Sequence, residues 1–232
     1  MTPTTQHLLW RPWGLCLALA LALALALAAC SSKPPVPDWQ MNAHGAAQKA
    51  VQAYLAGETR VATLEFARAR QETARTGQPG LLAQVHLLEC AAQVASLEMK
   101  PCSAFEALRL DASAAQVAYA DYLAGTLPAS AAALLPQSQQ AVATATDANA
   151  ATALAAISDP MSRLVAAGVL LRTGHAHPQT MQLATDTASA QGWRRPLLAW
   201  LLLQAQRAEQ AGQSDAAAQL RRRIAVVEQG GG

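Results

Sequence analysis

Aromatic side chains and excess charge are both scarce in this sequence. Phenylalanine, tryptophan and tyrosine make up 4% of its 232 residues, and 17 lysines and arginines nearly balance 15 aspartates and glutamates. Binding to a nucleic-acid backbone requires a basic face that releases counterions, and base stacking requires a platform of aromatic rings. The composition therefore argues against a nucleic-acid partner.

Catalytic motifs and strand patterns are absent as well. No Gly-x-Ser-x-Gly, His-Glu-x-x-His or phosphate-binding glycine loop occurs in the sequence. No stretch after Ala43 alternates β-branched with polar residues, as a half-buried strand would. The sequence thus predicts no sheet, no catalytic residue, no cofactor and no metal ligand, and a protein that is not an enzyme.

The long apolar run of the chain lies near its beginning. From Trp13 to Ala29, about 17 residues carry no charge, which corresponds to roughly 25 Å of helix and is slightly short for a membrane span. Arg11 precedes this run, and small residues lead from it to Cys30. A positive start, a short apolar segment and small residues before a break are typical of a secretory signal peptide. An uncleaved membrane anchor is the alternative.

The end of the apolar run, Leu27-Ala28-Ala29-Cys30, resembles the lipobox of bacterial lipoproteins. The resemblance implies that residues 1–29 are removed as a signal peptide and that Cys30 becomes a lipidated first residue. Two or more acyl chains would then hold the protein stably on a membrane. Because Ser31 rather than an aspartate follows the cysteine, the chain is similar to lipoproteins sent on to the outer membrane, with the folded part facing the periplasm.

A proline-rich segment separates Cys30 from the rest of the chain. Three prolines within positions 34–37 fix φ and remove backbone donors, which favours extended polyproline II structure. We interpret residues 30–42 as the lipidated N-terminus and its stiff tether. Residues 43–229 are then one helical-repeat domain, and the glycines at 230–232 are a disordered tail.

Two further cysteines, Cys90 and Cys102, remain after the expected processing. In an oxidising compartment such a pair is interpreted first as a disulfide. If the helix that contains Cys90 ends near Ser96 and the chain turns at Lys100-Pro101, the intervening residues are long enough to bring Cys102 back to it. Two buried free thiols are the alternative, and redox catalysis lacks the Cys-x-x-Cys spacing that would support it.

The remainder of the chain has the composition and punctuation of helices. Alanine, leucine, glutamine, glutamate and arginine dominate, and glycines and prolines interrupt them at intervals that leave about ten helices of roughly 10 to 20 residues. We therefore predict an all-α fold. Tyr54-Leu55-Ala56-Gly57 recurs 68 residues later as Tyr122-Leu123-Ala124-Gly125, a spacing of two periods of about 34 residues.

Within this pattern the chain resembles tetratricopeptide repeats. In the first hairpin, small residues and one aromatic residue stand where that family places them, at Ala50, Ala62, Phe66 and Ala69. The last hairpin keeps four residues in comparable places, Ala205, Gly212, Ala217 and Ile224. Arg221 stands where the aromatic residue belongs, and the middle units match poorly. The resemblance implies a helix-turn-helix repeat array, an α-solenoid with degenerate units.

The titratable residues outside the last hairpin are predicted to be structural or solvated and not to form a functional site. His175-Ala176-His177 lies in a glycine- and proline-rich turn with no carboxylate or cysteine nearby in the sequence, so a solvated loop is favoured over a metal site. His86 falls inside an apolar helix, which favours a partly buried, hydrogen-bonded imidazole. Charges three or four residues apart on the second helix predict salt-linked pairs on a solvated face: Glu65, Arg68, Glu72 and Arg75.

The last hairpin offers the residues most suited to a partner. Leu197–Leu203 is apolar on every face of its helix, so we expect it to be buried between layers of the array. Tryptophan and arginine are the residue types that most often dominate binding energy. The rim of this hairpin is therefore predicted to bind a partner through Trp193, Arg194, Arg195, Arg221, Arg222 and Arg223. The alternative is that the arginines are solvated and simply favourable near the C-terminus of a helix.

Together these features predict a lipid-anchored periplasmic helical-repeat protein that acts as an interaction or scaffold module in an envelope assembly. Its expected partners are the membrane, through the N-terminal lipid, and a protein or peptide bound to the concave surface of the stacked hairpins. The alternative is an envelope enzyme or a small-ligand-binding protein with a site between the helices. A deep pocket with converging titratable groups would favour the alternative, and an open groove would favour the scaffold.

Overall fold

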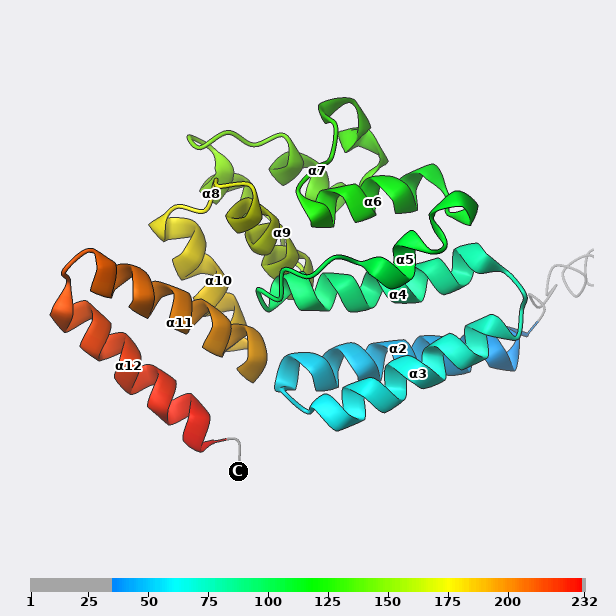
Figure 1. Cartoon of the computed structure of the whole chain (residues 1–232), viewed down its shortest axis with the longest axis horizontal. Coiled ribbons are helices and arrows are strands. Elements are labelled where there is room, and N and C mark those ends of the chain that lie inside the picture. The colour runs from blue at the N-terminus through cyan, green and yellow to red at the C-terminus, as the bar shows by residue number, and fades with distance from the viewer. Residues whose placement is uncertain (1–34, 231–232) are drawn as a thin grey trace, which may run out of the picture. The chain divides into compact units, whose positions relative to one another are not determined.

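The computed structural model describes residues 35–230 of the chain (Figure 1). The predicted signal peptide, residues 30–34 of the predicted tether, with Cys30, and the last two glycines lie outside these residues. Between residues 35 and 230 there are eleven α-helices, two short 3-10 helices and no strand, which confirms the predicted all-α class.

The helices follow one another with short connections. The chain begins with α2 (Asp38–Ala56), α3 (Thr59–Ala74), α4 (Pro79–Ala95), α5 (Ser103–Glu106) and the 3-10 helix η1 (Arg109–Asp111). Its middle forms α6 (Ala114–Ala124), η2 (Ala129–Leu134), α7 (Gln137–Ala143) and α8 (Ala150–Ala155). The last four helices are α9 (Pro160–Arg172), α10 (Pro178–Ala190), α11 (Arg194–Gln210) and α12 (Ser214–Gln229).

The helical unit begins earlier in the chain than the sequence predicts. Asp38–Asn42, expected to belong to the tether, lies at the start of α2. The carboxylate of Asp38 lies in that turn, where it interacts favourably with the helix dipole. Pro37 is the last proline of the proline-rich segment, and proline disfavours helix interiors. No proline therefore prevents a helix from beginning at Asp38.

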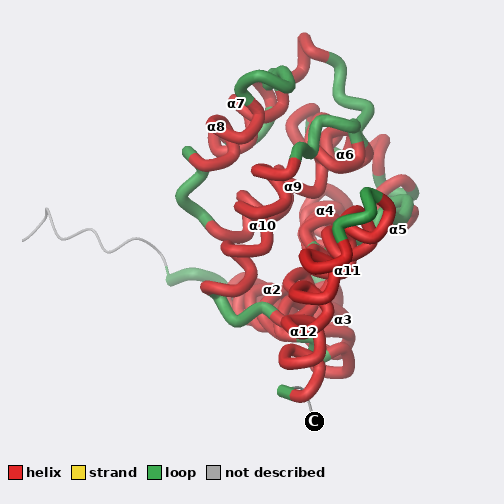
Figure 2. Tube along the Cα trace, turned by 90° about the vertical axis from the view of Figure 1, so that its left-hand side faces the viewer, coloured by secondary structure: helices red, strands yellow, loops and turns green. Residues whose placement is uncertain are grey.

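Long helices pair as hairpins at both ends of this unit. α2 packs along α3, and α11 packs along α12 (Figures 1 and 2). Each hairpin turns at a glycine with positive φ, Gly57 at 92° and Gly212 at 70°, a conformation that residues with a side chain rarely adopt. Between the two hairpins, α5, α7 and α8 have only 4, 7 and 6 residues, so the predicted length of 10–20 residues is wrong there.

Helices that are distant in sequence also pack together. α4 packs against α9, and α2 contacts α11. In a linear repeat array each unit contacts only its neighbours. The contacts of α4 with α9 and of α2 with α11 therefore go beyond those of a simple linear array. At the crossing of α4 and α9, a Cβ atom placed on Gly168 would lie 2.4 Å from the carbonyl oxygen of Val94. The two helices can approach this closely because residue 168 has no side chain.

The small residues and the aromatic residue singled out in the first hairpin are all buried. Ala50, Ala62 and Ala69 are buried where α2 and α3 meet, and Phe66 is buried beside them. Small side chains allow the two backbones to approach, and the aromatic ring supplies apolar area, on the order of 25 cal/mol per Å² removed from water. These four residues therefore occupy the kinds of position that the sequence pattern assigns to them.

A tight turn ends α4. The helix ends at Ala95. Two residues later, Leu97 has a φ of 60°, in the left-handed region that residues other than glycine rarely adopt. The amide of Leu97 donates to the carbonyl of Val94, and the amide of Glu98 donates to the carbonyl of Gln93. These are the two hydrogen bonds of a Schellman motif, which normally uses glycine because the left-handed conformation costs other residues roughly 1 kcal/mol.

Beyond this turn a disulfide joins Cys102 to Cys90, with their Cα atoms 5.9 Å apart. Both cysteines are partly buried and pack against the core. On the chain-entropy model, closing a loop of this size stabilises the fold by about 3 kcal/mol. The disulfide and the turn together fix the segment that carries Glu98.

The crossing of α4 and α9 can be tested at Gly168. We expect Gly168→Ala to lower the free energy of unfolding by about 2 to 3 kcal/mol, because the new methyl group meets backbone rather than a movable side chain. Gly45→Ala is the control, since a Cβ at that position in α2 meets nothing within 4 Å. It should raise stability by roughly 0.5 to 1 kcal/mol. Urea denaturation of both variants measures the difference, and equal effects would contradict the close crossing.

Candidate partner-binding surface

The two tryptophans of the last hairpin are buried. Trp193 is 8% exposed, and its indole nitrogen donates to the side-chain oxygen of Gln52 at 3.3 Å. Trp200 is fully buried and donates to the carbonyl of Ala95 at 3.3 Å. The prediction that Trp193 lies on an accessible rim is therefore wrong, because α2 covers its ring.

Arg195 connects three segments of the chain. Its guanidinium donates to the carbonyl oxygen of Tyr54 and to the hydroxyl of Thr59, both at 2.7 Å, and lies 3.4 Å from the carboxylate of Glu98. The central carbon of the guanidinium lies 4.3 Å from the centre of the Tyr54 ring, a cation–π distance. With its side chain only 23% exposed, Arg195 is a structural residue and not the accessible one that the sequence predicts.

Glu98 and Tyr54 complete this arrangement, which we call the Arg195 junction. The Tyr54 hydroxyl donates to the carboxylate of Glu98, and Lys100 lies 2.6 Å from the other carboxylate oxygen. Burial is the largest cause that raises the pKa of Tyr54, so its hydroxyl stays a neutral donor. The junction comprises Tyr54, Thr59, Glu98, Lys100 and Arg195.

Arg194 has a structural partner as well. Its guanidinium donates to the backbone carbonyls of Val227 and Glu228, at 3.3 and 3.4 Å. These carbonyls belong to the last turn of α12, where the helix dipole is negative and a cation is favourable. Arg194 therefore holds the end of α12 against the beginning of α11, and the prediction of a free partner-binding side chain is corrected for this residue too.

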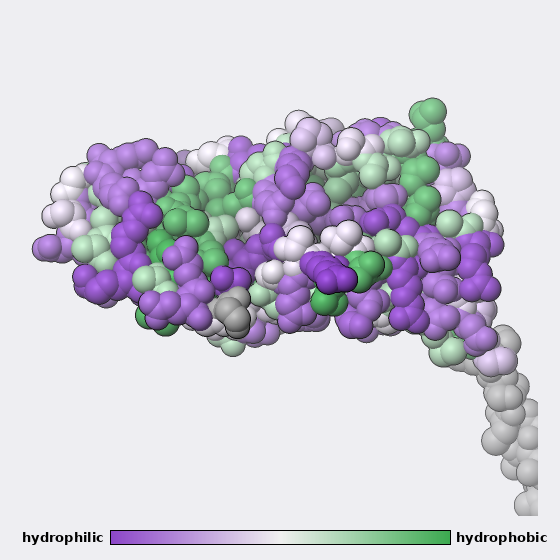
Figure 3. Space-filling model, turned by 60° about the horizontal axis from the view of Figure 1, so that its bottom comes forward, coloured by the Kyte–Doolittle hydropathy of each residue, from purple (hydrophilic) through white to green (hydrophobic). Residues whose placement is uncertain are grey.

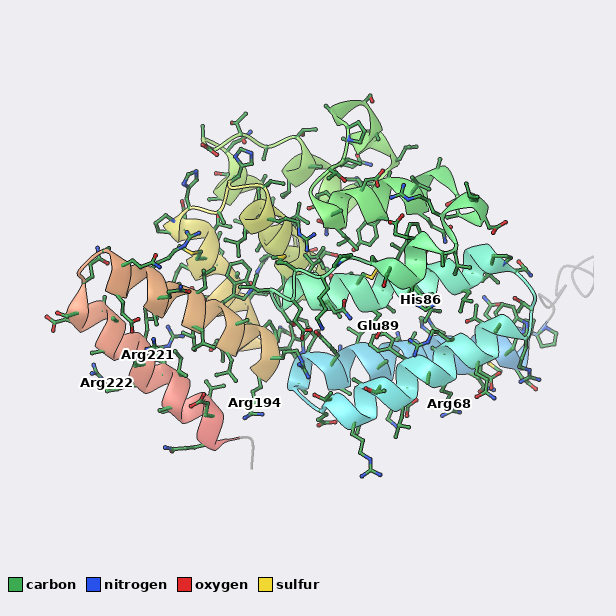
Figure 4. The ribbon with its side chains drawn as sticks, viewed as in Figure 1. Arg68, His86, Glu89, Arg194, Arg221 and Arg222 are labelled. Carbon is green, nitrogen blue, oxygen red and sulfur yellow. A yellow bond between two sulfur atoms is a disulfide. The ribbon has the colours of Figure 1, made fainter. Side chains whose placement is uncertain are left out.

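The three consecutive arginines of α12 do not share one environment, and Figure 4 labels the first two, Arg221 and Arg222. Successive residues of an α-helix are about 100° apart around its axis, so a run of three cannot share one face. Arg221 pairs with Glu209 of α11 at 2.8 Å, Arg222 is exposed, and Arg223 is partly buried. The run is thus not a single basic patch, although Arg221 and Arg222 remain accessible to a partner.

Apolar side chains are exposed on the same hairpin. Leu197 and Leu201 are buried as predicted, but Leu202 is 43% exposed, and Val226 of α12 is 69% exposed. Figure 3 shows apolar atoms gathered at this end of the molecule and bordered by hydrophilic side chains. We call the accessible set of Leu202, Arg221, Arg222 and Val226 the terminal hairpin surface.

The other predicted charged residues lie mostly where the spacing places them. The pairs Glu65–Arg68 and Glu72–Arg75 form on α3, at 3.9 and 2.8 Å. Glu65, however, is buried at 9% exposure, with Lys49 of α2 at 2.5 Å from its carboxylate, so the prediction of a fully solvated face is wrong for this residue. It is buried because α2 packs across that side of α3.

Two of the five histidines approach a carboxylate that the sequence does not place near them. The ring nitrogens of His175 and His177 lie 2.5 and 3.3 Å from one oxygen of Asp147, and their hydrogen bonds lower the pKa of Asp147. Over residues 35–230, no group of three or more His, Cys, Asp and Glu side chains is arranged to hold a metal ion. His86 is partly buried, and that burial, with Arg70 nearby, lowers its pKa.

Comparison with known proteins identifies no relative: no family model, curated protein or solved structure matches this chain. In the part that the structure describes, no helix is both long enough and apolar enough to cross a membrane. A proposal of function therefore rests on the burial, charge and contacts of the residues described above.

The Arg195 junction predicts a large difference between two arginines of the same hairpin. Arg195→Gln should lower the free energy of unfolding by about 2 to 4 kcal/mol, because it removes charge-assisted hydrogen bonds from three partners. Arg222→Gln, on the exposed face of α12, should change it by less than about 0.5 kcal/mol. Chemical denaturation compares the two, and similar losses would show that the junction does not support the fold.

Glu98 predicts a sensitivity to acid. Burial by itself would raise the pKa of Glu98, but hydrogen bonds from Lys100 and Tyr54 and the charge of Arg195 lower it overall. A carboxyl with a lowered folded-state pKa stabilises the fold above its unfolded pKa of about 4.3, and that contribution is lost as the pH falls through the folded pKa. Between about pH 6 and about pH 3, Glu98→Gln should therefore lose less unfolding free energy than the unmodified protein. The same loss in both proteins would contradict the assignment.

Proposed function

We propose that this chain is a lipid-anchored helical module that binds a protein partner in the bacterial cell envelope. The lipobox-like end of its apolar run and the prolines that follow support attachment to the outer membrane through Cys30, with the helical unit in the periplasm. The hairpins α2–α3 and α11–α12 support a degenerate helix-turn-helix array, a type of scaffold that binds other proteins over extended surfaces.

The terminal hairpin surface is the observation that carries this proposal. Leu202 and Val226 offer apolar area, and Arg222 lies one helical turn before Val226 on the same face of α12. Exposed apolar side chains beside arginine allow a partner to combine buried area with charge-assisted hydrogen bonds. Because α12 packs along α11, its outward face is available to such a partner.

Photo-crosslinking in the native host tests where a partner binds. A photoreactive amino acid is placed at position 202 or 226, and at position 64 as the control. Leu64 is an exposed leucine, 62% accessible, on α3 at the other hairpin. We expect one protein adduct from positions 202 and 226 and none from position 64. Adducts of equal yield at all three positions, or none at positions 202 and 226, would contradict the proposal.

A matched pair of double variants tests the energetics of the same surface. Arg222→Glu with Val226→Asn alters an arginine and an apolar residue four positions apart on α12. Arg60→Glu with Leu64→Asn makes the same kinds of change, in the same order and four positions apart, on α3. All four side chains are exposed, so both proteins should remain folded. Recovery of the crosslinked partner by affinity purification should fall at least tenfold for the α12 variant alone.

A further inference from the structure

A groove lies between α4, α6 and η2, away from the terminal hairpin. Its volume is about 430 Å³, within the range of small-molecule sites. The wall contributed by α4 consists of Gln84, Leu87, Leu88 and Ala91, which are spaced at i, i+3, i+4 and i+7 and so share one face of the helix. This face extends the groove over about 10 Å, or two helical turns.

The side of the groove at the end of η2 is apolar. Leu134, Leu135 and Pro136 close the groove from the side of η2, and Leu134 is 46% exposed. Leucine and proline at this position offer an occupant apolar contact and no hydrogen-bond donor from their side chains. A hydrocarbon segment that enters the groove is therefore removed from water on both sides.

No ionisable side chain except the phenol of Tyr119 lines the groove. An ionised group that entered it would lose hydration and gain no opposite charge, which is costly. The electrostatics of the lining therefore select an uncharged occupant.

Two polar side chains of α6 line the groove. One of them already has hydrogen-bond partners within the protein, and the other has none in the part of the chain that the structure describes. The amide of Gln116 is committed, since it donates to the carbonyl of Gly80 at 2.8 Å and accepts from the backbone of Ser113 at 2.9 Å. The hydroxyl of Tyr119 makes no hydrogen bond within residues 35–230, and its ring packs 6.2 Å from that of Tyr122. Burial raises the pKa of Tyr119, so the phenol is a neutral donor.

We propose that this groove binds a neutral amphiphile with one hydrocarbon chain, whose hydroxyl or carbonyl group pairs with Tyr119. The hydrocarbon chain lies along Leu88 and Leu134, the accessible leucines of the lining. The absence of charge in the lining and the available phenol hydroxyl are complementary to such a molecule. This ligand site is distinct from the terminal hairpin surface and does not rest on the proposed function.

A displacement assay on the full-length protein tests the proposal. The neutral fluorophore N-phenyl-1-naphthylamine reports binding by an increase in its emission. Decanoylglycerol, which is neutral, should displace it, and decanoate, which has the same chain and a negative charge, should compete at least roughly tenfold more weakly. Equal competition by the two compounds, or no emission increase with the protein, would overturn the proposal.

Variants locate the site and separate its parts. Leu134→Gln should weaken fluorophore binding, and Leu64→Gln, which alters an exposed leucine outside the groove, should not. Tyr119→Phe should weaken decanoylglycerol roughly threefold to tenfold and leave fluorophore binding unchanged, because one neutral hydrogen bond is lost. Gln84→Arg should reverse the preference in favour of decanoate. If Leu134→Gln and Leu64→Gln behave alike, or Gln84→Arg leaves the preference unchanged, the ligand is not bound in this groove.

Discussion

The fold depends on the guanidinium of Arg195. This group joins the C-terminal end of α2, the start of α3 and the turn after α4 to the first turn of α11, so that it connects residues 141 positions apart in the chain. Helices of a linear array need no such connection, because each unit is stabilised by its neighbours. Here the first and last hairpins are both held against the C-terminal end of α4. Bringing residues so distant in the chain together costs conformational entropy, and the packing of α4 against α9 helps to offset that cost.

The C-terminal end of α4 is the point where these constraints meet. Its last carbonyls accept from the indole of Trp200 and lie against Gly168, and the turn at Leu97 then directs Glu98 to the Arg195 junction. A leucine in the left-handed conformation persists only where the surroundings determine the backbone strongly. The disulfide to Cys102 supplies part of that determination, because it fixes the segment that follows the turn. One short stretch of chain thus combines a strained turn, a covalent bond and an ion pair.

The sequence predicts much of the local structure and little of what depends on distant contacts. Glycine and proline mark the ends of the long helices well, because their backbone effects are local, and the spacing of Ala50, Ala62 and Phe66 correctly predicts burial. The roles of Trp193, Arg194 and Arg195 could not be predicted, since α2 and the end of α12 provide their partners. Asp147 likewise meets His175 through the tertiary fold alone. Alanine-rich composition predicted longer helices in residues 103–155 than form there, since α5, α7 and α8 are short.

The arginines show how residues of one kind can take different roles within a single hairpin. A guanidinium is always charged, so its position is decided by whether carbonyl or carboxylate oxygens can surround it. Arg194 and Arg195 begin α11 beside such oxygens and become structural, whereas Arg222 is exposed on α12. Arg222 thus leaves a charge on the accessible face of α12, whereas the groove beside α4 has none in its lining. The uncharged groove beside α4 and the outward face of α12 are therefore chemically different surfaces of the same helical unit.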